Sequence, residues 1–420
     1  MEYKLTKIGE QMSNRTGVRA IMKDIHETLR SGSGRSFINL SPGNPVILPE
    51  VVELWKRHAK DLIDSPEFGE VVGRYGMTQG YQPFIEAIVK DFNSRYNLAL
   101  TEKNVLITSG SQSLYFFAAN MLGGLRSNGK LAKILLPLCP DYTGYGGISV
   151  YPEALVSFKP ILDINEGSHS FKYRPDFNNF KIPNDTGAVI FSRPCNPTGN
   201  VLTDSEVEKI VDLAAQVNVP VFVDSAYAPP YPALNFTEMS PILRPNVIHC
   251  LSLSKAGLPG ERIGVALGDP ELLERLESFE SNASIHSSRF GQAIAARAIN
   301  SGELGDISEK IIRPFYRSKF SVFEDALRSA TPPTIPFYLH RGEGALFAWI
   351  WFRDLPIDDW SLYQKLKSNN VMVVPGSTFF PGLNEDWKHK SECIRVSLTA
   401  SEQELIEGAK RIARTISEIY

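Results

Sequence analysis

The fold of this chain is decided by a stretch that reads VPVFVDS at residues 219–225 and VIHCLSLS at residues 247–254. Both are short apolar runs rich in β-branched residues, and each ends where polar residues begin. Such runs are typical of buried strands in a parallel sheet. Each run should therefore deliver polar side chains to the sheet edge at which ligands bind in folds of this kind.

The same pattern extends along the chain from about residue 100 to residue 270. Further apolar runs are VLIT at 105–108, KILLPL at 133–138, AVIFS at 188–192 and RIGVALG at 262–268. Helical patterns alternate with them, and that alternation predicts an α/β fold with a mostly parallel central sheet wrapped by helices.

The two ends of the chain predict a second, smaller α+β domain. Near the N-terminus, apolar residues fall at helical spacing between residues 16 and 30, and the turn SPGNP at 41–45 follows. After about residue 303 come a long helical pattern, three strand-like runs (GALFAWIWF, VMVVPG and CIRVSL) and an amphipathic helix through Ile416. We expect an N-terminal arm and part of the small domain at 1–60, a large cofactor-binding domain at 61–305 and a small C-terminal domain at 306–420.

Composition narrows the class of protein. The 420 residues are 43 % apolar, and 44 Lys and Arg against 47 Asp and Glu give a net charge of −3. This balance argues against nucleic acid or an anionic membrane as a partner. The four cysteines lie far apart without a CxxC pair, which favours reduced thiols and predicts no metal site. The N-terminus has no apolar signal core and no run is long enough to span a membrane, so we expect a cytoplasmic protein.

The strongest chemical signal is SLSKAGLPGERIG at residues 252–264. Lys255 follows a predicted strand, and an amine that is partly buried beside cationic groups becomes neutral enough to form an imine. Ser252, Ser254 and Arg262 would offer donors and a fixed positive charge to a phosphate. A surface lysine in a Ser/Gly loop is the alternative interpretation.

Two further signals precede it. In SRPCNPTGN at 192–200, Asn196 lies at a strand end and would donate to a ring oxygen, although Asn-Pro-Thr-Gly is also a good turn. In VFVDSAY at 221–227, Asp224 ends a buried strand, where an unpaired carboxylate is costly, and a protonated pyridine nitrogen is a suitable cationic partner. Tyr227 would then reach the phenolic oxygen of such a ring. The alternative for Asp224 is a structural ion pair or a helix cap.

Asn196, Asp224 and Lys255 follow one another at intervals of 28 and 31 residues, each at the end of a predicted strand. In this the sequence resembles the class I aminotransferases of pyridoxal phosphate (PLP) fold type I, whose order is N-P-T-G, D-x-x-Y, S-x-S-K and a phosphate-binding arginine. The resemblance covers nearly the whole chain. It implies a large domain with a mostly parallel sheet, a smaller α+β domain from the chain ends, and Lys255 as the residue that holds PLP as a Schiff base.

The resemblance implies roles for four residues in the first half of the chain. Ser111 and Gln112 of SGSQSLY open a helix and would bind the phosphate at its N-terminus; an ordinary helix cap is the alternative. Tyr142 of LCPDYTGY would stack on the cofactor ring, or else be a core tyrosine. Tyr75 would reach across a homodimer interface to the phosphate of the neighbouring subunit, so that the active sites would be shared.

The resemblance also implies a substrate site. Arg395 in CIRVSLT would grip the substrate α-carboxylate through its planar guanidinium. Gly43 in SPGNP would let the backbone close over the substrate. An arginine on an exposed strand face is the alternative for Arg395.

Several segments together resemble one subgroup, the valine–pyruvate aminotransferases. They are SLSKAGLPGERIG, SRPCNPTGNVLTD, PDYTGY, GSQS and VPGSTFFPGL. The interval of seven residues from Lys255 to Arg262 is one shorter than the family's usual interval and is shared with this subgroup. The resemblance implies ping-pong transamination between a small apolar amino acid (valine or alanine) and a 2-oxo acid (pyruvate or 2-oxoisovalerate). Arg289 has no clear place as a second carboxylate-binding arginine, and His286 is more simply structural.

Other functions of the same scaffold stay open at this point. β-Elimination, oxygen-dependent oxidation or transamination of a different amino acid would use the same cofactor site. A PLP-binding regulator without turnover would carry a DNA-binding segment, and none is visible. A dehydrogenase is disfavoured because the chain lacks a GxGxxG turn.

Overall fold

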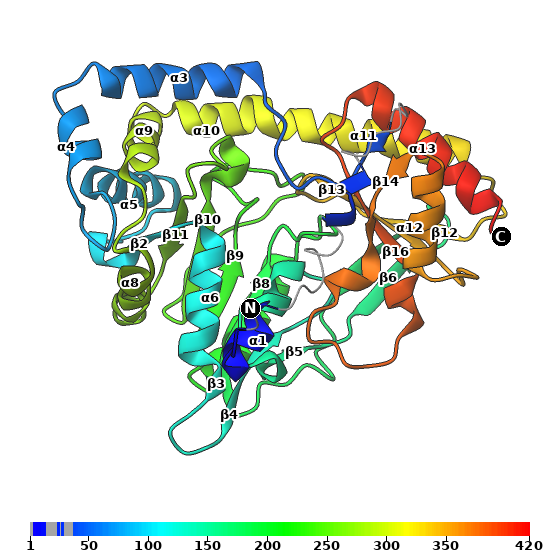
Figure 1. The fold of residues 1–420 in the computed structure, drawn as a ribbon, viewed down its shortest axis with the longest axis horizontal. Helices are drawn as coiled ribbons and strands as arrows, with labels where there is room; N and C mark the ends of the chain where they lie inside the picture. The colour runs from blue at the N-terminus through cyan, green and yellow to red at the C-terminus, as the bar shows by residue number, and fades with distance from the viewer. Residues whose placement is uncertain (1–2, 14–22, 26, 29–36) are drawn as a thin grey trace.

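The computed structural model describes residues 3–13, 23–25, 27–28 and 37–420. Most of the helix expected at residues 16–30 lies outside these described residues. Two β-sheets dominate the described chain, and helices pack on both (Figure 1).

The larger sheet has eight strands in the order β2-β11-β10-β9-β8-β4-β3, with β5 beside β4. All neighbours from β10 to β5 pair in parallel except β3, while β11 runs antiparallel between β10 and β2. The prediction of a mostly parallel sheet is confirmed. The strands are β2 (Val105–Thr108), β3 (Gly124–Leu125), β4 (Leu131–Leu136), β5 (Leu155–Ser157), β8 (Thr186–Ser192), β9 (Val221–Asp224), β10 (Val247–Ser252) and β11 (Gly264–Leu267).

The register of the central strands brings the predicted chemistry together. Ser192 at the end of β8 lies opposite Asp224 at the end of β9, and Asp224 lies opposite Cys250 near the end of β10. Because the strands are parallel, the segments that follow β8, β9 and β10 all leave from one edge of the sheet. That edge carries the candidate site.

Helices cover the faces of this sheet, and their buried faces come from residues at helical spacing. In α5, for example, Phe84, Ile88 and Phe92 recur every four residues and are buried. Figure 1 shows α6 lying along one face of the sheet. These helices are α3 (Pro49–Ile63), α4 (Phe68–Gly73), α5 (Gln82–Tyr96), α6 (Ser111–Leu122), α7 (Asp204–Ala215), α8 (Pro270–Ser284) and α9 (Arg289–Asn300). Short 3-10 turns are η1 (Glu102–Asn104), η2 (Thr143–Gly147), η3 (Pro152–Ala154), η4 (Leu253–Ala256), η6 (Gly376–Phe379) and η7 (Lys388–Ser391).

The second sheet has six strands in the order β15-β16-β13-β12-β7-β6. Its strands are β6 (Ile161–Asn165), β7 (Ser170–Arg174), β12 (Phe337–His340), β13 (Phe347–Phe352), β15 (Val374–Pro375) and β16 (Cys393–Ser397). The N-terminal strand β1 (Ile38–Asn39) pairs in parallel with β14 (Val371–Met372), so a segment from the first part of the chain lies beside a segment from its last part. Further helices in the described part of the chain are α1 (Lys7–Ser13), α10 (Glu303–Ile307), the π-helical η5 (Ser308–Ile312), α11 (Arg313–Ala330), α12 (Asp359–Ser368) and α13 (Glu402–Ser417).

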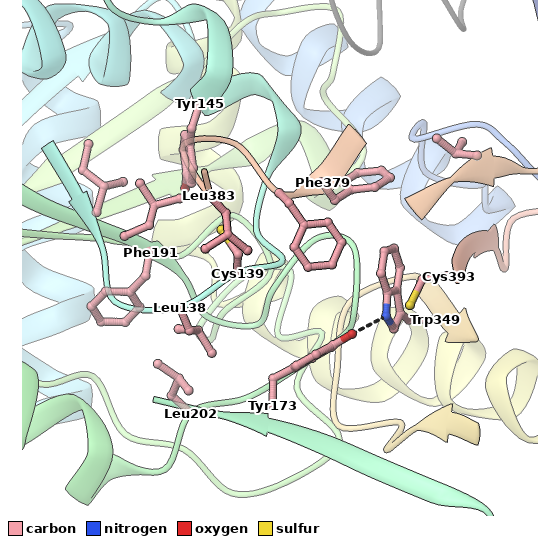
Figure 2. Close-up of a cluster of buried hydrophobic side chains, with 14 of the residues drawn as sticks. Leu138, Cys139, Tyr145, Tyr173, Phe191, Leu202, Trp349, Phe379, Leu383 and Cys393 are labelled. Atoms are coloured by element: carbon pink, nitrogen blue, oxygen red, sulfur yellow. Dashed lines mark hydrogen bonds between the residues drawn. The ribbon is translucent and has the colours of Figure 1, made fainter. Parts of the chain in front are cut away.

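One pairing in this sheet joins distant parts of the sequence. β6 and β7 fall inside the range 61–305 that was expected to form the large domain, yet β7 pairs in parallel with β12. Trp349 on β13 donates a 2.9 Å hydrogen bond from Nε1 to the Tyr173 hydroxyl on β7, as Figure 2 shows. Within the described chain, one of the two hydrophobic core clusters contains buried residues from both sheets. The domain boundaries at residues 60 and 305 stay a prediction.

Candidate active site

A cavity of about 1010 Å³ opens at the edge of the larger sheet where β8, β9 and β10 end. It lies between residues from both sheets and from the N-terminal part of the chain. Of the expected site residues, those that line it are Gly43, Ser111, Gln112, Tyr142, Asn196, Asp224, Tyr227, Ser252, Ser254, Lys255, Arg262 and Arg395.

Lys255 lies in η4, directly after β10, where the Ser252 hydroxyl caps the turn by accepting a hydrogen bond from Ser254 N. The lysine Nζ donates a 2.9 Å hydrogen bond to the Gly43 carbonyl oxygen. Burial, followed by the positive charges of Arg395 and Arg262, lowers the pKa of Lys255 to about 8. A substantial fraction of the amine is therefore neutral near physiological pH, as imine formation requires.

Helix α3 supports the turn that carries Lys255. Trp55 Nε1 donates a 3.0 Å hydrogen bond to the Ala256 carbonyl oxygen. Gly257 follows with a φ of 98°, and a Cβ there would lie 2.4 Å from Val51 Cγ1. The turn packs this closely on α3 only because residue 257 is glycine.

Asp224 lies at the end of β9 and is only 6 % exposed. Its Oδ2 accepts a 2.9 Å hydrogen bond from the Tyr145 hydroxyl, and its Oδ1 accepts one of 3.1 Å from Ala226 N. Burial raises the pKa of Asp224 to about 6, against the pull of these donors and of Lys255. A buried carboxylate with no ion pair in the described residues suits a cationic ring nitrogen.

The start of α6 forms an anion cradle with Arg262. Gly110 precedes the helix with a φ of 90°, and a Cβ at Gly110 would lie 2.3 Å from Arg262 Nη2. Arg262 Nη1 donates a 3.3 Å hydrogen bond to Ser254 Oγ. The N-terminus of α6 has no side-chain cap, so the backbone amides of its first turn can serve as donors. These amides and the Arg262 guanidinium fit a phosphate group.

Arg395 lies on β16 and reaches the cavity from the second sheet. Its Nη1 donates a 3.0 Å hydrogen bond to Asn196 Oδ1, and its Nη2 donates one of 2.9 Å to the Ser41 carbonyl oxygen. The guanidinium lies 4.2 Å from the Phe347 ring centroid and 4.9 Å from that of Phe379. Burial lowers its pKa to about 10, so the group remains a cation near neutral pH and suits a carboxylate.

Two tyrosines complete the wall of the cavity. The Tyr142 ring meets the Tyr145 ring edge-on at 5.4 Å, and a Cβ at Gly144 would lie 2.2 Å from the Tyr142 ring. Tyr227 is buried, which raises its hydroxyl pKa, and Lys255 Nζ lies 5.9 Å from its ring centroid. Both rings are held in place by contacts within the chain itself.

Tyr75 is separate from this cavity. Its side chain is exposed, and its ring contacts His286 edge-on at 5.9 Å. Arg289 also lies outside the cavity, where its Nη1 donates to the carbonyl oxygens of Glu70 and Arg74. The expectation that Tyr75 serves a neighbouring subunit stays a prediction.

The sequence did not point to several residues that shape this site. Tyr145 holds Asp224, and Phe347 and Phe379 flank the Arg395 guanidinium. The sequence signal that pointed toward Tyr145 was its position, three residues after Tyr142 in the quoted run LCPDYTGY. The aromatic runs that carry the two phenylalanines look like ordinary core segments.

Together, these groups fit PLP. The cavity offers the Lys255 amine with its lowered pKa, the buried Asp224 carboxylate and the anion cradle at the start of α6. It also offers the Arg395 guanidinium, which can bind a substrate carboxylate. In the part of the chain that the structure describes, no cluster of three or more His, Cys, Asp or Glu could hold a metal ion. Across those same residues no helix is long and apolar enough to cross a membrane.

Comparison with known proteins agrees with this geometry. The family model for aminotransferase class I and II matches residues 169–412. The chain is 33 % identical to the valine–pyruvate aminotransferase of Escherichia coli (strain K12) over 413 residues, which cover 98 % of each protein.

Solved structures show the same likeness. A putative amino-acid aminotransferase from Psychrobacter arcticum 273-4 superposes with a TM-score of 0.93 at 35 % identity, covering 100 % of this chain and 99 % of that one. The valine–pyruvate aminotransferase of Salmonella typhimurium LT2 superposes with a TM-score of 0.86 at 33 % identity, covering 95 % of this chain and 99 % of that one.

Proposed function

This chain belongs to the class I and II aminotransferases, which are PLP-dependent enzymes of fold type I, and on that premise we propose which amino group it transfers. The proposed reaction exchanges the amino group between a small apolar amino acid, valine or alanine, and a 2-oxo acid, pyruvate or 2-oxoisovalerate. Two similar proteins are named valine–pyruvate aminotransferases, which supports valine as amino donor and pyruvate as acceptor.

The proposal rests on the charged residues that line the cavity. Among the described residues, the only cationic ones in this lining are Lys255, Arg262 and Arg395. We assign Lys255 to the cofactor aldehyde, Arg262 to the phosphate and Arg395 to the substrate α-carboxylate. Among the described residues, no cation in the cavity then remains for a second carboxylate, so an uncharged side chain is favoured over a dicarboxylate.

The apolar part of the lining supports the same conclusion. Met12, Val374, Phe380 and Pro381 line the cavity beside Tyr142. These four side chains offer apolar contact and no hydrogen-bonding group that a polar substrate side chain would need. An apolar side chain can be desolvated there without leaving an unpaired polar group.

We propose the following residues as the holders of the cofactor. Asp224 would face the pyridine nitrogen, Asn196 and Tyr227 the phenolic oxygen, and Tyr142 the ring face. Ser111, Gln112, Ser252, Ser254 and Arg262 would bind the phosphate. When bound, PLP supplies the electron sink that allows an α-proton to leave an amino acid.

Lys255 and Arg395 would do the remaining chemistry. The neutral Lys255 Nζ takes the α-proton of the bound amino acid, and the same atom later returns a proton as general acid. Arg395 holds the α-carboxylate on the side of the second sheet, with Asn196 orienting the guanidinium. Because both the amino acid and the 2-oxo acid carry that carboxylate, one site serves both half-reactions in a ping-pong order.

An absorbance titration tests the substrate pair. Holoenzyme is mixed with L-valine and then with pyruvate, and in parallel with L-aspartate and then 2-oxoglutarate. We expect valine to convert the visible cofactor band to the aminated form and pyruvate to restore it, with alanine and 2-oxoisovalerate as products. A band that responds to aspartate and not to valine would reject the proposal while leaving the family unchanged.

Product analysis separates the other reactions that this scaffold supports. A β-elimination would release ammonia, and an oxidase would consume oxygen. Transamination requires a 2-oxo acid acceptor and does neither. Valine turnover without an acceptor would therefore contradict the proposal.

We further propose a cytoplasmic homodimer with shared active sites. All four cysteines are free and buried, which suits a reducing compartment, and the exposed Tyr75 would serve the neighbouring subunit. Mixing subunits that carry Lys255→Ala with subunits that carry Tyr75→Ala tests the sharing, because a hybrid dimer would then hold one intact site. Activity above the sum of the two parents is expected, and no gain on mixing would contradict shared sites.

A further inference from the structure

Asp141 is a buried carboxylate directly before Tyr142 and is only 1 % exposed. Its Oδ1 accepts a 2.6 Å hydrogen bond from Tyr142 N and another from Ser192 Oγ, while its Oδ2 accepts one of 3.0 Å from Ser192 N. The Cys195 thiol lies 3.7 Å from Oδ1. All of these neighbours direct donors at the carboxylate, and charge-assisted bonds of this kind are roughly twice as strong as neutral ones.

These bonds tie together elements that are far apart in the sequence. Ser192 ends β8, and Tyr142 leads into η2, so the carboxylate joins the two segments at the sheet edge. Asp141 N also donates a 2.9 Å hydrogen bond to the Phe379 carbonyl oxygen in η6. Figure 2 shows Phe379 and Tyr145 from these segments in the same buried cluster.

Each of the joined elements carries a part of the site. Tyr142 and Ser192 line the cavity, and Phe379 flanks the Arg395 guanidinium. Asp141 itself is not among the residues that line the cavity. Its effect on the cofactor must therefore pass through the residues that it holds.

We infer that Asp141 is a positioning residue of the cofactor site, whose ionised carboxylate fixes Tyr142 and Ser192 where they line the cavity. The inference concerns cofactor binding and does not depend on which amino acid is the substrate. The ionised form matters because a protonated carboxyl would place a hydrogen against a shell of donors.

The electrostatic surroundings give this role a pH dependence. Burial raises the pKa of Asp141 to about 7, and the charge of Asp224 on β9 acts in the same direction. The other titratable groups that face it are Cys139 before it, Tyr145 in η2 and Cys195 after β8. As pH falls through about 7, Asp141 gains a proton and its hold on Ser192 and Tyr142 weakens.

Cofactor binding to apoenzyme tests the inference without any turnover. PLP is titrated into wild-type, Asp141→Asn and Glu392→Gln apoenzyme, with quenching of protein fluorescence as the readout, from about pH 6 to about pH 8.5. Glu392 is the matched control: it is 4 % exposed, accepts a 2.8 Å hydrogen bond from Trp351 Nε1 and lies outside the cavity.

For Asp141→Asn we expect the dissociation constant for PLP to rise about tenfold at about pH 8, the equivalent of one lost charge-assisted hydrogen bond. The loss of affinity on going to about pH 6 should also be shallower than in the wild type, because the titrating group is gone. Glu392→Gln should melt at a lower temperature and bind PLP like the wild type. A purely structural role for Asp141 would give the Glu392→Gln behaviour and would overturn the inference.

Ser192→Ala provides a second route if Asp141→Asn does not fold. It keeps the Asp141 carboxylate and the Ser192 backbone donor and removes only the hydroxyl donor. We expect weaker PLP binding that still depends on pH, with the midpoint moved to higher pH, because the Ser192 hydroxyl lowers the pKa of Asp141 in the wild type. Wild-type affinity in this variant would contradict the inference.

Discussion

Lys255 Nζ donates a hydrogen bond of 2.9 Å to the carbonyl oxygen of Gly43. The lysine follows the central strand β10, whereas Gly43 lies in the N-terminal turn that leads into α3. The contact therefore places the chain's N-terminal segment directly against the reactive amine. Lys255 is therefore positioned in part by a backbone oxygen, and a motif of side-chain types cannot reveal such a contact.

Lys255→Ala should abolish turnover and leave the fold intact. The variant loses the amine that carries the cofactor and moves the proton, so the rate of amino transfer should fall by more than about 10³-fold. Transaminase assays together with far-UV circular dichroism check both parts. The exposed Lys56, whose side chain is 67 % exposed, gives the control variant Lys56→Ala with wild-type activity.

Capture of PLP by the apoenzyme should accelerate as pH rises through about 8. Burial lowers the pKa of Lys255 from its ordinary value of 10.5, so the neutral amine appears near pH 8 and not above 10. Stopped-flow growth of the visible band at several pH values measures this midpoint. A midpoint near 10 would mean that the amine is not desolvated as described.

Arg395→Lys should raise KM for the amino acid more than it lowers kcat. A lysine keeps the charge but lacks the planar pair of donors that binds a carboxylate at two points. We expect KM to rise by about 10- to 100-fold, the cost of about 1.5–3 kcal/mol for one charged hydrogen bond. Arg244→Lys, at a surface ion pair with Asp212, is the control and should change neither constant.

Gly110→Ala should reduce the preference of the apoenzyme for PLP over pyridoxal. The new Cβ would lie 2.3 Å from Arg262 Nη2 and would displace the guanidinium from the phosphate cradle. Gly129→Ala is a matched control, because Gly129 also has a positive φ but a Cβ there would have no neighbouring atom within 4 Å. Equal loss of preference in both variants would show that backbone strain, and not the cradle, is responsible.

Asp224→Asn should change how apoenzyme stability depends on pH. Because burial raises the pKa of Asp224 from 3.8 to about 6, its neutral form favours folding below about pH 4, and this contribution is lost as pH rises through about 6. Asp224→Asn has no carboxyl to titrate and should not lose this stabilisation. The difference in the free energy of unfolding between variant and wild type should therefore change between about pH 4 and about pH 6. Urea unfolding of both apoenzymes at several pH values measures it; parallel curves would contradict the assigned pKa.

The sequence predicted the strands of the larger sheet well. The runs at 105–108, 219–225 and 247–254 contain β2, β9 and β10, because a buried parallel strand leaves a continuous apolar signature that is local in the chain. The pairing of β7 with β12 left no such signature, since it joins residues about 170 positions apart through backbone hydrogen bonds. The assignment of residues 161–174 to the second sheet therefore became visible only in three dimensions.

The sequence by itself determined which residue types stand at the strand ends, and hence that Asn196, Asp224 and Lys255 would share one sheet edge. Only the tertiary structure decided how those residues are held and charged. Asp224 accepts a hydrogen bond from Tyr145, and Lys255 donates one to the carbonyl oxygen of Gly43. Burial brings the pKa of Lys255 to about 8. All three effects depend on groups from other segments. The physical reason is that a motif is local, whereas desolvation and hydrogen-bond partners depend on how the whole chain packs.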